Sequence, residues 1–218
     1  MRRLSGPLVL FVASLMVLQA RATVVTSIPG GTAIPMPAIN FFGPGPQVFG
    51  TTNLVTWTST NATHQGGSVF GYTGVYGYLG NGFWTGALGP MAGLNDSTDF
   101  FGITDTMTFS FANPVSAVGG FLNYGPGSLK PTTIAVWDVH GNLIESFNLT
   151  FLTGGGADTG AFYGFEEAGA IIKSFTLTDN YVGIVNLTTS SVPEPSPLLL
   201  IVSGVLGAVA YGRRRLGL

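Results

Sequence analysis

Aspartates crowd one stretch of this chain, and oxygen-rich stretches of this kind are typical of calcium-binding loops. Residues 95–99 read Asn-Asp-Ser-Thr-Asp, and Asp105 follows shortly after them. Calcium takes about 6–8 oxygen ligands from carboxylates, carbonyls and waters. We therefore predict a calcium site formed by Asp96, Asp99 and Asp105. The spacing does not match the EF-hand loop, and the alternative is a set of Asx turns ahead of a strand that begins at Thr106.

Aromatic residues supply a second candidate site. Residues 70–84 alternate aromatic side chains with glycines, and tryptophans stand at positions 57, 84 and 137. An aromatic ring has an apolar face and, in Tyr and Trp, a polar tip, which suits stacking on a sugar ring. We predict glycan contact through Trp57, Tyr76 and Trp84. The alternative is that these rings pack in the core.

The remaining reactive residues do not have the spacing of a catalytic site. The chain has two histidines and no cysteine, which excludes disulfides, thiol catalysis and a cysteine metal site. A hydrolytic triad needs a histidine oriented by a buried carboxylate, whereas His140 falls in a predicted turn and Asp138, two residues before it, is expected to be solvated. Glu166 and Glu167 are neighbours on a predicted strand and point to opposite faces, so we expect a solvated edge. The prediction is a protein that is not an enzyme and needs no cofactor, calcium excepted.

Charge is scarce and unevenly distributed. Charged residues make up 8% of the chain, and six of the eight basic residues lie near its ends, at positions 2, 3, 21, 213, 214 and 215. Residues 23–191 hold two lysines against nine carboxylates, a formal charge of −7. Because phosphate binding needs a basic face, we predict no nucleic-acid partner.

The first 22 residues are typical of a signal peptide. Arg2 and Arg3 precede an apolar run at 8–18, and Ala20-Arg21-Ala22 places small residues where signal peptidase reads them. Cleavage before Thr23 is therefore predicted, with export through the Sec translocon. The alternative is an uncleaved membrane anchor.

The last stretch, residues 192–218, has three parts. Pro193, Pro195 and Pro197 prevent a helix from extending backward. An uncharged apolar run at 198–212 follows, shorter than the roughly 20 residues of a full membrane span. Arg213, Arg214 and Arg215 then hold the C-terminus on the cytoplasmic side. The alternative is an ordinary C-terminal anchor whose prolines are incidental.

This tail resembles the PEP-CTERM sorting signal of Gram-negative bacteria, with Pro193-Glu194-Pro195 as its box, 198–212 as its transmembrane helix and 213–215 as its basic cluster. The resemblance implies processing by exosortase near the box. It also implies a chain held for a time in the inner membrane and then delivered to the cell surface or extracellular matrix.

Between the two ends, the sequence predicts strands joined by turns. Glycine and proline are abundant, yet the aromatic fraction of 12% is too high for a disordered linker. Residues 106–111 alternate polar and apolar side chains, the period of a half-buried strand. Further strands are expected at 24–28, 54–58, 117–124, 132–139, 143–152, 161–165, 171–178 and 183–189. Asn81-Gly82 predicts a hairpin turn, Gly119-Gly120 a bulge, and Asn113-Pro114 the end of the strand that begins at Thr106.

Strands at this spacing predict one antiparallel β-sandwich over residues 23–191. Their order also looks like the jelly-roll ectodomains that accompany this kind of tail, with Phe109-Ser110-Phe111 and residues 118–121 among the matching pieces. Such domains are similar to carbohydrate-binding sandwiches. Three functions remain open: a non-catalytic surface or matrix protein, which we favour, a module that contacts exopolysaccharide, and a glycan-acting hydrolase.

Overall fold

The computed structural model describes residues 22–61, 67–95, 105–127, 130–179 and 181–191, and these residues form an all-β protein with no α-helix. Its elements are β1 (Thr23–Val25), β2 (Thr32–Ala33), β3 (Phe41–Phe42), β4 (Gln47–Phe49), β5 (Val55–Ser59), β6 (Ser68–Tyr72), β7 (Tyr76–Gly77), the 3-10 helix η1 (Leu79–Asn81), β8 (Phe83–Trp84), β9 (Met91–Asn95), β10 (Asp105–Val115), β11 (Ala117–Tyr124), β12 (Thr133–Trp137), β13 (Leu143–Asn148), β14 (Ala161–Glu166), β15 (Ile172–Asp179) and β16 (Tyr181–Ser190). The predicted all-β class is confirmed.

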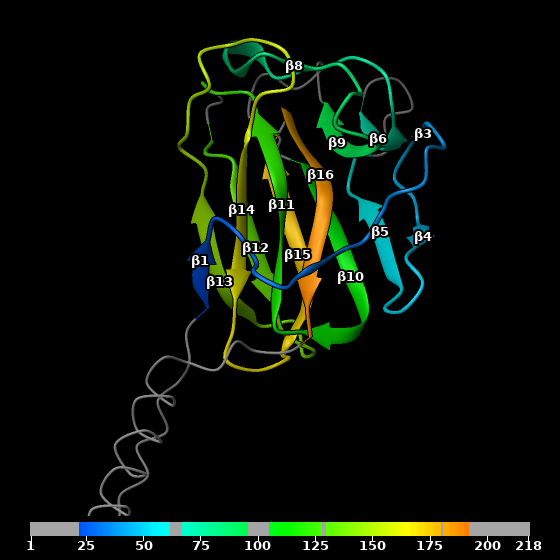
Figure 1. Cartoon of the computed structure of the whole chain (residues 1–218), viewed down its shortest axis with the longest axis vertical. Helices are drawn as coiled ribbons and strands as arrows, with labels where there is room; N and C mark the ends of the chain where they lie inside the picture. Colours follow the sequence, from blue (N-terminus) through cyan, green and yellow to red (C-terminus); the bar gives the residue numbers. More distant parts are fainter. Residues whose placement is uncertain (1–21, 62–66, 96–104, 128–129, 180, 192–218) are drawn as a thin grey trace, which may run out of the picture.

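Two antiparallel sheets make up the body of the molecule (Figure 1). The larger sheet has the order β1-β14-β11-β16-β9-β6-β3, with β2 also paired to β16. The smaller sheet has the order β13-β12-β15-β10-β5-β4. From β9 onward the chain changes sheet at every connection except the β12–β13 hairpin. Strands that are distant in sequence therefore become neighbours.

The main core lies between the two sheets and follows from the alternation of side chains along each strand. On β10 the side chains of Met107, Phe109 and Phe111 are buried, while the residues between them are partly exposed. Phe165 of the larger sheet meets Phe175 of the smaller sheet edge to face, with ring centroids 6.3 Å apart. Burial of a side chain of this size contributes roughly 1.5–3 kcal/mol, so these apolar rows hold the two layers together.

A second apolar cluster covers the outer face of the larger sheet. The β7–β8 hairpin folds over β9 and β16, and its side chains pack on that face rather than in the main core. The cluster consists of Val69, Tyr76, Tyr78, Trp84, Met91 and Val185. Gly183 makes room for it, since a Cβ there would lie 2.0 Å from the Tyr78 hydroxyl. Part of the larger sheet is thus buried on both faces.

The hairpin predicted at Asn81-Gly82 is present, but its connection is longer than a two-residue turn. Strands β7 and β8 pair across η1, and Asn81 at the end of η1 is fully buried. Its side-chain carbonyl accepts from the Thr153 amide at 3.0 Å. Its backbone carbonyl accepts from the Thr153 and Thr159 hydroxyls, both at 2.9 Å, and from the Asn123 side chain at 3.1 Å. Asn81 therefore fixes the hairpin to the 151–159 loop.

Other predicted boundaries were partly wrong. Residues 117–124 form β11 as predicted, and the expected bulge is seen as a register shift between Gly119 and Phe121. Asn113-Pro114 does not end β10, which continues through a register shift to Val115. The strand expected at 143–152 ends at Asn148. Strands β2, β3, β4, β6 and β9 were not predicted.

The two ends of the chain fall largely outside this description. Residues 1–21 of the predicted signal peptide, the Pro193-Glu194-Pro195 box, the 198–212 run and the 213–215 arginines are not among the described residues. Within the described ranges, no helix is long and apolar enough to span a membrane.

Candidate functional site

The predicted glycan platform is wrong, because its three rings are core residues. Exposed fractions are 0% for Trp57, 5% for Tyr76 and 1% for Trp84. Trp57 packs against Phe70, with ring centroids 5.2 Å apart, and its indole lies in the main core. A sugar has no access to these faces, so the alternative of core packing holds.

Trp84 and Tyr76 are enclosed by the second cluster. Trp84 stacks on Phe121 at 6.2 Å and meets Tyr78 edge to face at 4.8 Å, and its indole N–H donates to the Thr159 carbonyl at 2.7 Å. Burial raises the pKa of both Tyr76 and Tyr78 well above the ordinary phenol value. These groups hold the hairpin on the sheet.

Two carboxylates meet at one end of the smaller sheet, where β10 begins and β15 ends. Asp105 and Asp179 are directly opposite each other in the β10–β15 register, with exposed fractions of 9% and 0%. Both share the parity of buried neighbours, Met107 on β10 and Leu177 on β15, so both side chains point between the sheets. Opposed residues on antiparallel strands have Cβ atoms about 4.5–5.5 Å apart, which is close enough for both carboxylates to bind one cation.

Two hydroxyl groups, one just after β5 and one just before β12, hold this carboxylate pair. The Thr60 hydroxyl donates to Asp105 Oδ1 at 2.8 Å, and the Thr132 hydroxyl donates to Asp179 Oδ2. From the facing sheet, the Tyr124 hydroxyl donates to the Phe151 carbonyl at 2.9 Å. Burial, and then the charges of Asp179 and Tyr163, raise the pKa of Tyr124. The end of the sandwich therefore presents an oxygen-rich interior with negative charge.

Only part of the calcium site predicted at Asp96, Asp99 and Asp105 lies among the described residues. Asp105 is described, whereas Asp96 and Asp99 lie outside the described residues. Among the residues that the structure places, no three acidic or histidine side chains converge as a metal site. The sequence analysis did not predict Asp179 as a neighbour of Asp105. The signal was its spacing: Asp179 lies two residues after Leu177 and four after Phe175, so it shares their face of the strand. Calcium at this end of the sandwich stays a prediction.

The residues considered for catalysis have other roles. Asp138 shapes the β12–β13 turn: its carboxylate accepts from the His140 amide and from the Asn142 amide, each at 2.8 Å, and from the Asn142 side chain at 2.9 Å. These hydrogen bonds, those from Asn142 first, lower the pKa of Asp138. Glu167, expected at a solvated edge, is only 3% exposed, so that expectation was wrong. His64 lies outside the described residues.

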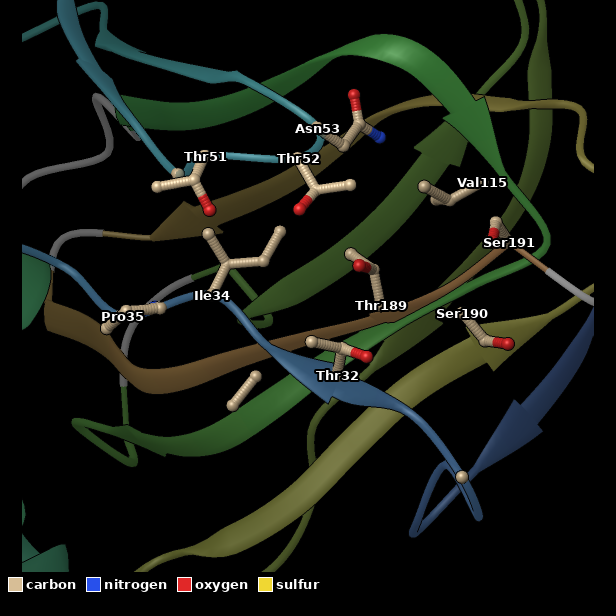
Figure 2. A pocket seen from close by; sticks show the side chains of 13 residues that line it. Thr32, Ile34, Pro35, Thr51, Thr52, Asn53, Val115, Thr189, Ser190 and Ser191 are labelled. Carbon is tan, nitrogen blue, oxygen red and sulfur yellow. The ribbon is translucent and has the colours of Figure 1, made fainter.

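A pocket of about 490 Å³ opens beside β2 and the end of β16 (Figure 2). Hydroxyl groups face it from three segments, and its apolar wall includes Ile34 and Val115. The hydroxyl-bearing residues are Thr32, Thr51, Thr52, Thr189, Ser190 and Ser191. Two hydrogen bonds fix the 50–53 loop over the pocket: the Asn53 side-chain amide donates to the Asn113 carbonyl, and the Asn113 backbone amide donates to the Asn53 side-chain oxygen, each at 2.8 Å. None of its thirteen lining residues is charged.

Comparison with known proteins gives no further assignment. No protein-family model, no curated protein and no solved structure matches this chain.

Proposed function

We propose that this chain is an exported, non-catalytic protein of the bacterial cell surface or extracellular matrix. The observation that carries the proposal is the three-part tail at 192–218, read together with the leader at 1–22. The Sec translocon and signal peptidase act first on such a chain, the inner membrane then holds it by residues 198–212, and exosortase processes it at Pro193-Glu194-Pro195. Arg213, Arg214 and Arg215 stop the transfer.

Two features of the fold support a structural role. The alternation of the last eight strands between two sheets has the order of a jelly roll, with β9-β16-β11-β14 facing β10-β15-β12-β13. Asp138, the carboxylate closest in sequence to His140, is occupied by hydrogen bonds within its own turn. These two features support the proposal of a compact sandwich over residues 23–191 that serves as a surface or matrix component.

The processing steps predict a defined mature chain. Intact-mass measurement of the protein recovered from the producing cell's surface is expected to show loss of residues 1–22 and of the arginines at 213–215. Replacing Glu194 with Ala is expected to leave the tail in place, because the box is disrupted. The matched control is Pro197→Ala, which alters the same tether outside the box. A mature wild-type chain that retains residues 213–215 would contradict the sorting proposal.

Contact with exopolysaccharide is the second candidate function, and the pocket in Figure 2 favours it. Its uncharged wall offers hydroxyls for hydrogen bonds and carbons for the apolar side of a sugar. Four threonines, Thr32, Thr51, Thr52 and Thr189, contribute to this wall. The proposal moves the glycan contact from the buried rings to these groups.

Co-sedimentation with the producer's own exopolysaccharide tests this candidate. Replacing Thr52 with Trp fills the pocket and is expected to weaken binding by about tenfold, a change of 1.4 kcal/mol. Thr150→Trp adds the same ring at an exposed position away from the pocket and serves as the control. Equal binding by both variants would remove the pocket from consideration. Release of new reducing ends would contradict the non-catalytic assignment.

A further inference from the structure

Glu167 is a buried carboxylate without a partner. It is 3% exposed, and neither of its carboxylate oxygens has a hydrogen-bond partner or measurable contact with solvent. It follows β14 directly and shares the parity of Phe165, so its side chain points toward the interior. Burying an unpaired carboxylate is costly, and nothing in the core packing explains why this position carries one.

The nearest charges make the position less favourable. Glu145 pairs in register with the buried Val136, so its side chain faces the same interior from the opposite sheet. Burial first, and then the charge of Glu145, raise the pKa of Glu167. Glu166, the adjacent residue, has the opposite parity and lies on the outer face. Among the residues that the structure describes, no positive group pairs with Glu167, and the nearby carboxylates make an unpaired negative charge there still less favourable.

The first strand brings one specific peptide bond to this carboxylate. In the β1–β14 register, Thr23 is opposite Glu166 and Val24 is opposite Phe165. Extending that register by one residue places Ala22 opposite Glu167. Ala22 is 7% exposed and belongs to the main core cluster. The peptide bond between Ala22 and Thr23 thus lies beside Glu167, and it is the bond at which the sequence predicts signal-peptidase cleavage.

We propose that cleavage before Thr23 supplies the missing partner, so that the new α-ammonium group of Thr23 forms an ion pair with Glu167. Hydrolysis consumes one water: the carboxylate formed on Ala22 leaves with the leader, and the amine formed on Thr23 takes up a proton. A free α-amino group has a pKa of about 7.7–8.0 and is largely charged at neutral pH. This inference rests on the proposed export, because only a processed chain has that amine.

The ion pair would make the fold sensitive to processing. Strand β1 is at the edge of the larger sheet as the structure describes it and pairs with β14. In the uncleaved chain it brings an uncharged peptide group to Glu167, and in the mature chain it brings a positive charge. The mature N-terminus is then fixed to the sheet, and the correctly cut form is the more stable one.

Glu167→Gln separates the two states by the sign of its effect. In the cleaved chain, this variant removes the partner of the ammonium group, and the midpoint of thermal unfolding at pH 7 is expected to fall by about 3 °C or more. In a chain kept uncleaved by Ala20→Phe, the same variant removes an unpaired buried charge, and the midpoint is expected to rise. Both forms are exported chains that are purified in the same detergent. Asp158→Asn, at a carboxylate that accepts from Thr85 away from β1, is the control and should change both forms alike.

The pH dependence has a defined direction. In the uncleaved chain the folded-state pKa of Glu167 is raised, so its contribution to stability is present at low pH and is lost as pH rises through that pKa. In the cleaved chain the ammonium group opposes the rise in the pKa of Glu167, so stability should not be lost as the pH rises. Glu167→Gln should abolish the difference.

Acylation of the α-amino group provides a readout that needs no variant. Pairing with Glu167 is expected to slow acylation of the folded mature protein at pH 7 by about tenfold relative to the same chain in urea, which corresponds to a rise of about one unit in the amine's pKa. Intact mass gives the N-terminal residue in the same samples. An N-terminus other than Thr23 would overturn the export cleavage and the ion pair together. Two results would overturn the ion pair alone in a chain that begins at Thr23. One is an amine that is acylated as fast in the folded protein as in urea. The other is a change in unfolding midpoint on Glu167→Gln that has the same sign in both forms.

Discussion

Replacing Trp57 with Ala is expected to remove about 3–5 kcal/mol from the free energy of unfolding, because a fully buried ring is replaced by a cavity. Domains of this kind have a total stability of about 5–15 kcal/mol. Trp84→Ala should cost a similar amount and also lose the indole hydrogen bond to the Thr159 carbonyl. Urea unfolding followed by circular dichroism measures both, and much of each variant should be unfolded in moderate urea where the wild type is folded.

The matched control for these substitutions is Phe83→Ala. Phe83 stands next to Trp84 in β8 but is 40% exposed, so its removal should cost far less. A Trp57→Ala protein with wild-type stability would contradict the core assignment. The result also bears on any glycan assay: loss of binding in Trp57→Ala or Trp84→Ala would report unfolding, so the pocket variant Thr52→Trp is the informative one.

The strands that the sequence predicts well are those with one buried face. Strand β10 alternates because its inner side chains meet the core and its outer ones meet solvent, and the period of two is plain in its sequence. Strand β15 alternates apolar and polar residues in the same way from Phe175 to Thr178, although Thr176 is itself buried. In such strands the alternation identifies both the strand and the face that is buried. Strands β10 and β15 were both predicted from the sequence.

Two of the strands that were missed, β6 and β9, are buried on both faces. In β6, Ser68, Val69, Phe70 and Gly71 are all buried, because the β7–β8 hairpin covers the outer face of the sheet. Strand β9 lies beside it under the same cover. Without alternation there is no period to read. The same tertiary contact explains the glycan error, since aromatic side chains among glycines look exposed until the segment that covers them is known.

The charged positions failed for a related reason. A carboxylate near a turn is usually solvated, so Glu167 was assigned to a solvated edge and Asp179 received no role. Parity with buried neighbours was the available signal: Glu167 follows Phe165 by two residues, and Asp179 follows Leu177 by two. What the sequence does not contain is the pairing of β10 with β15, which places Asp105 opposite Asp179.

Calcium is expected to bind at the end of the sandwich where Asp105 faces Asp179, and to raise the midpoint of thermal unfolding of the protein. Like charges directly opposite each other on neighbouring strands are destabilising, and a divalent cation bound by both carboxylates would remove that repulsion. A ligand that binds only the folded state at 100 times its dissociation constant adds about 2.7 kcal/mol, or about 5–10 °C for a domain of this size. Melting the full chain in millimolar calcium and in chelator measures the difference.

Asp179→Asn makes that test specific. In calcium the variant is expected to melt well below the wild type, because one charged ligand is lost, whereas in chelator it should melt at the same temperature or higher, because the repulsion with Asp105 is relieved. Asp158→Asn is the control: the Asp158 carboxylate accepts from the amide and hydroxyl of Thr85 at 2.8 and 2.7 Å on the exposed surface, so its loss should be equal in both solutions. Identical wild-type melting in calcium and chelator would exclude calcium at Asp96, Asp99, Asp105 and Asp179.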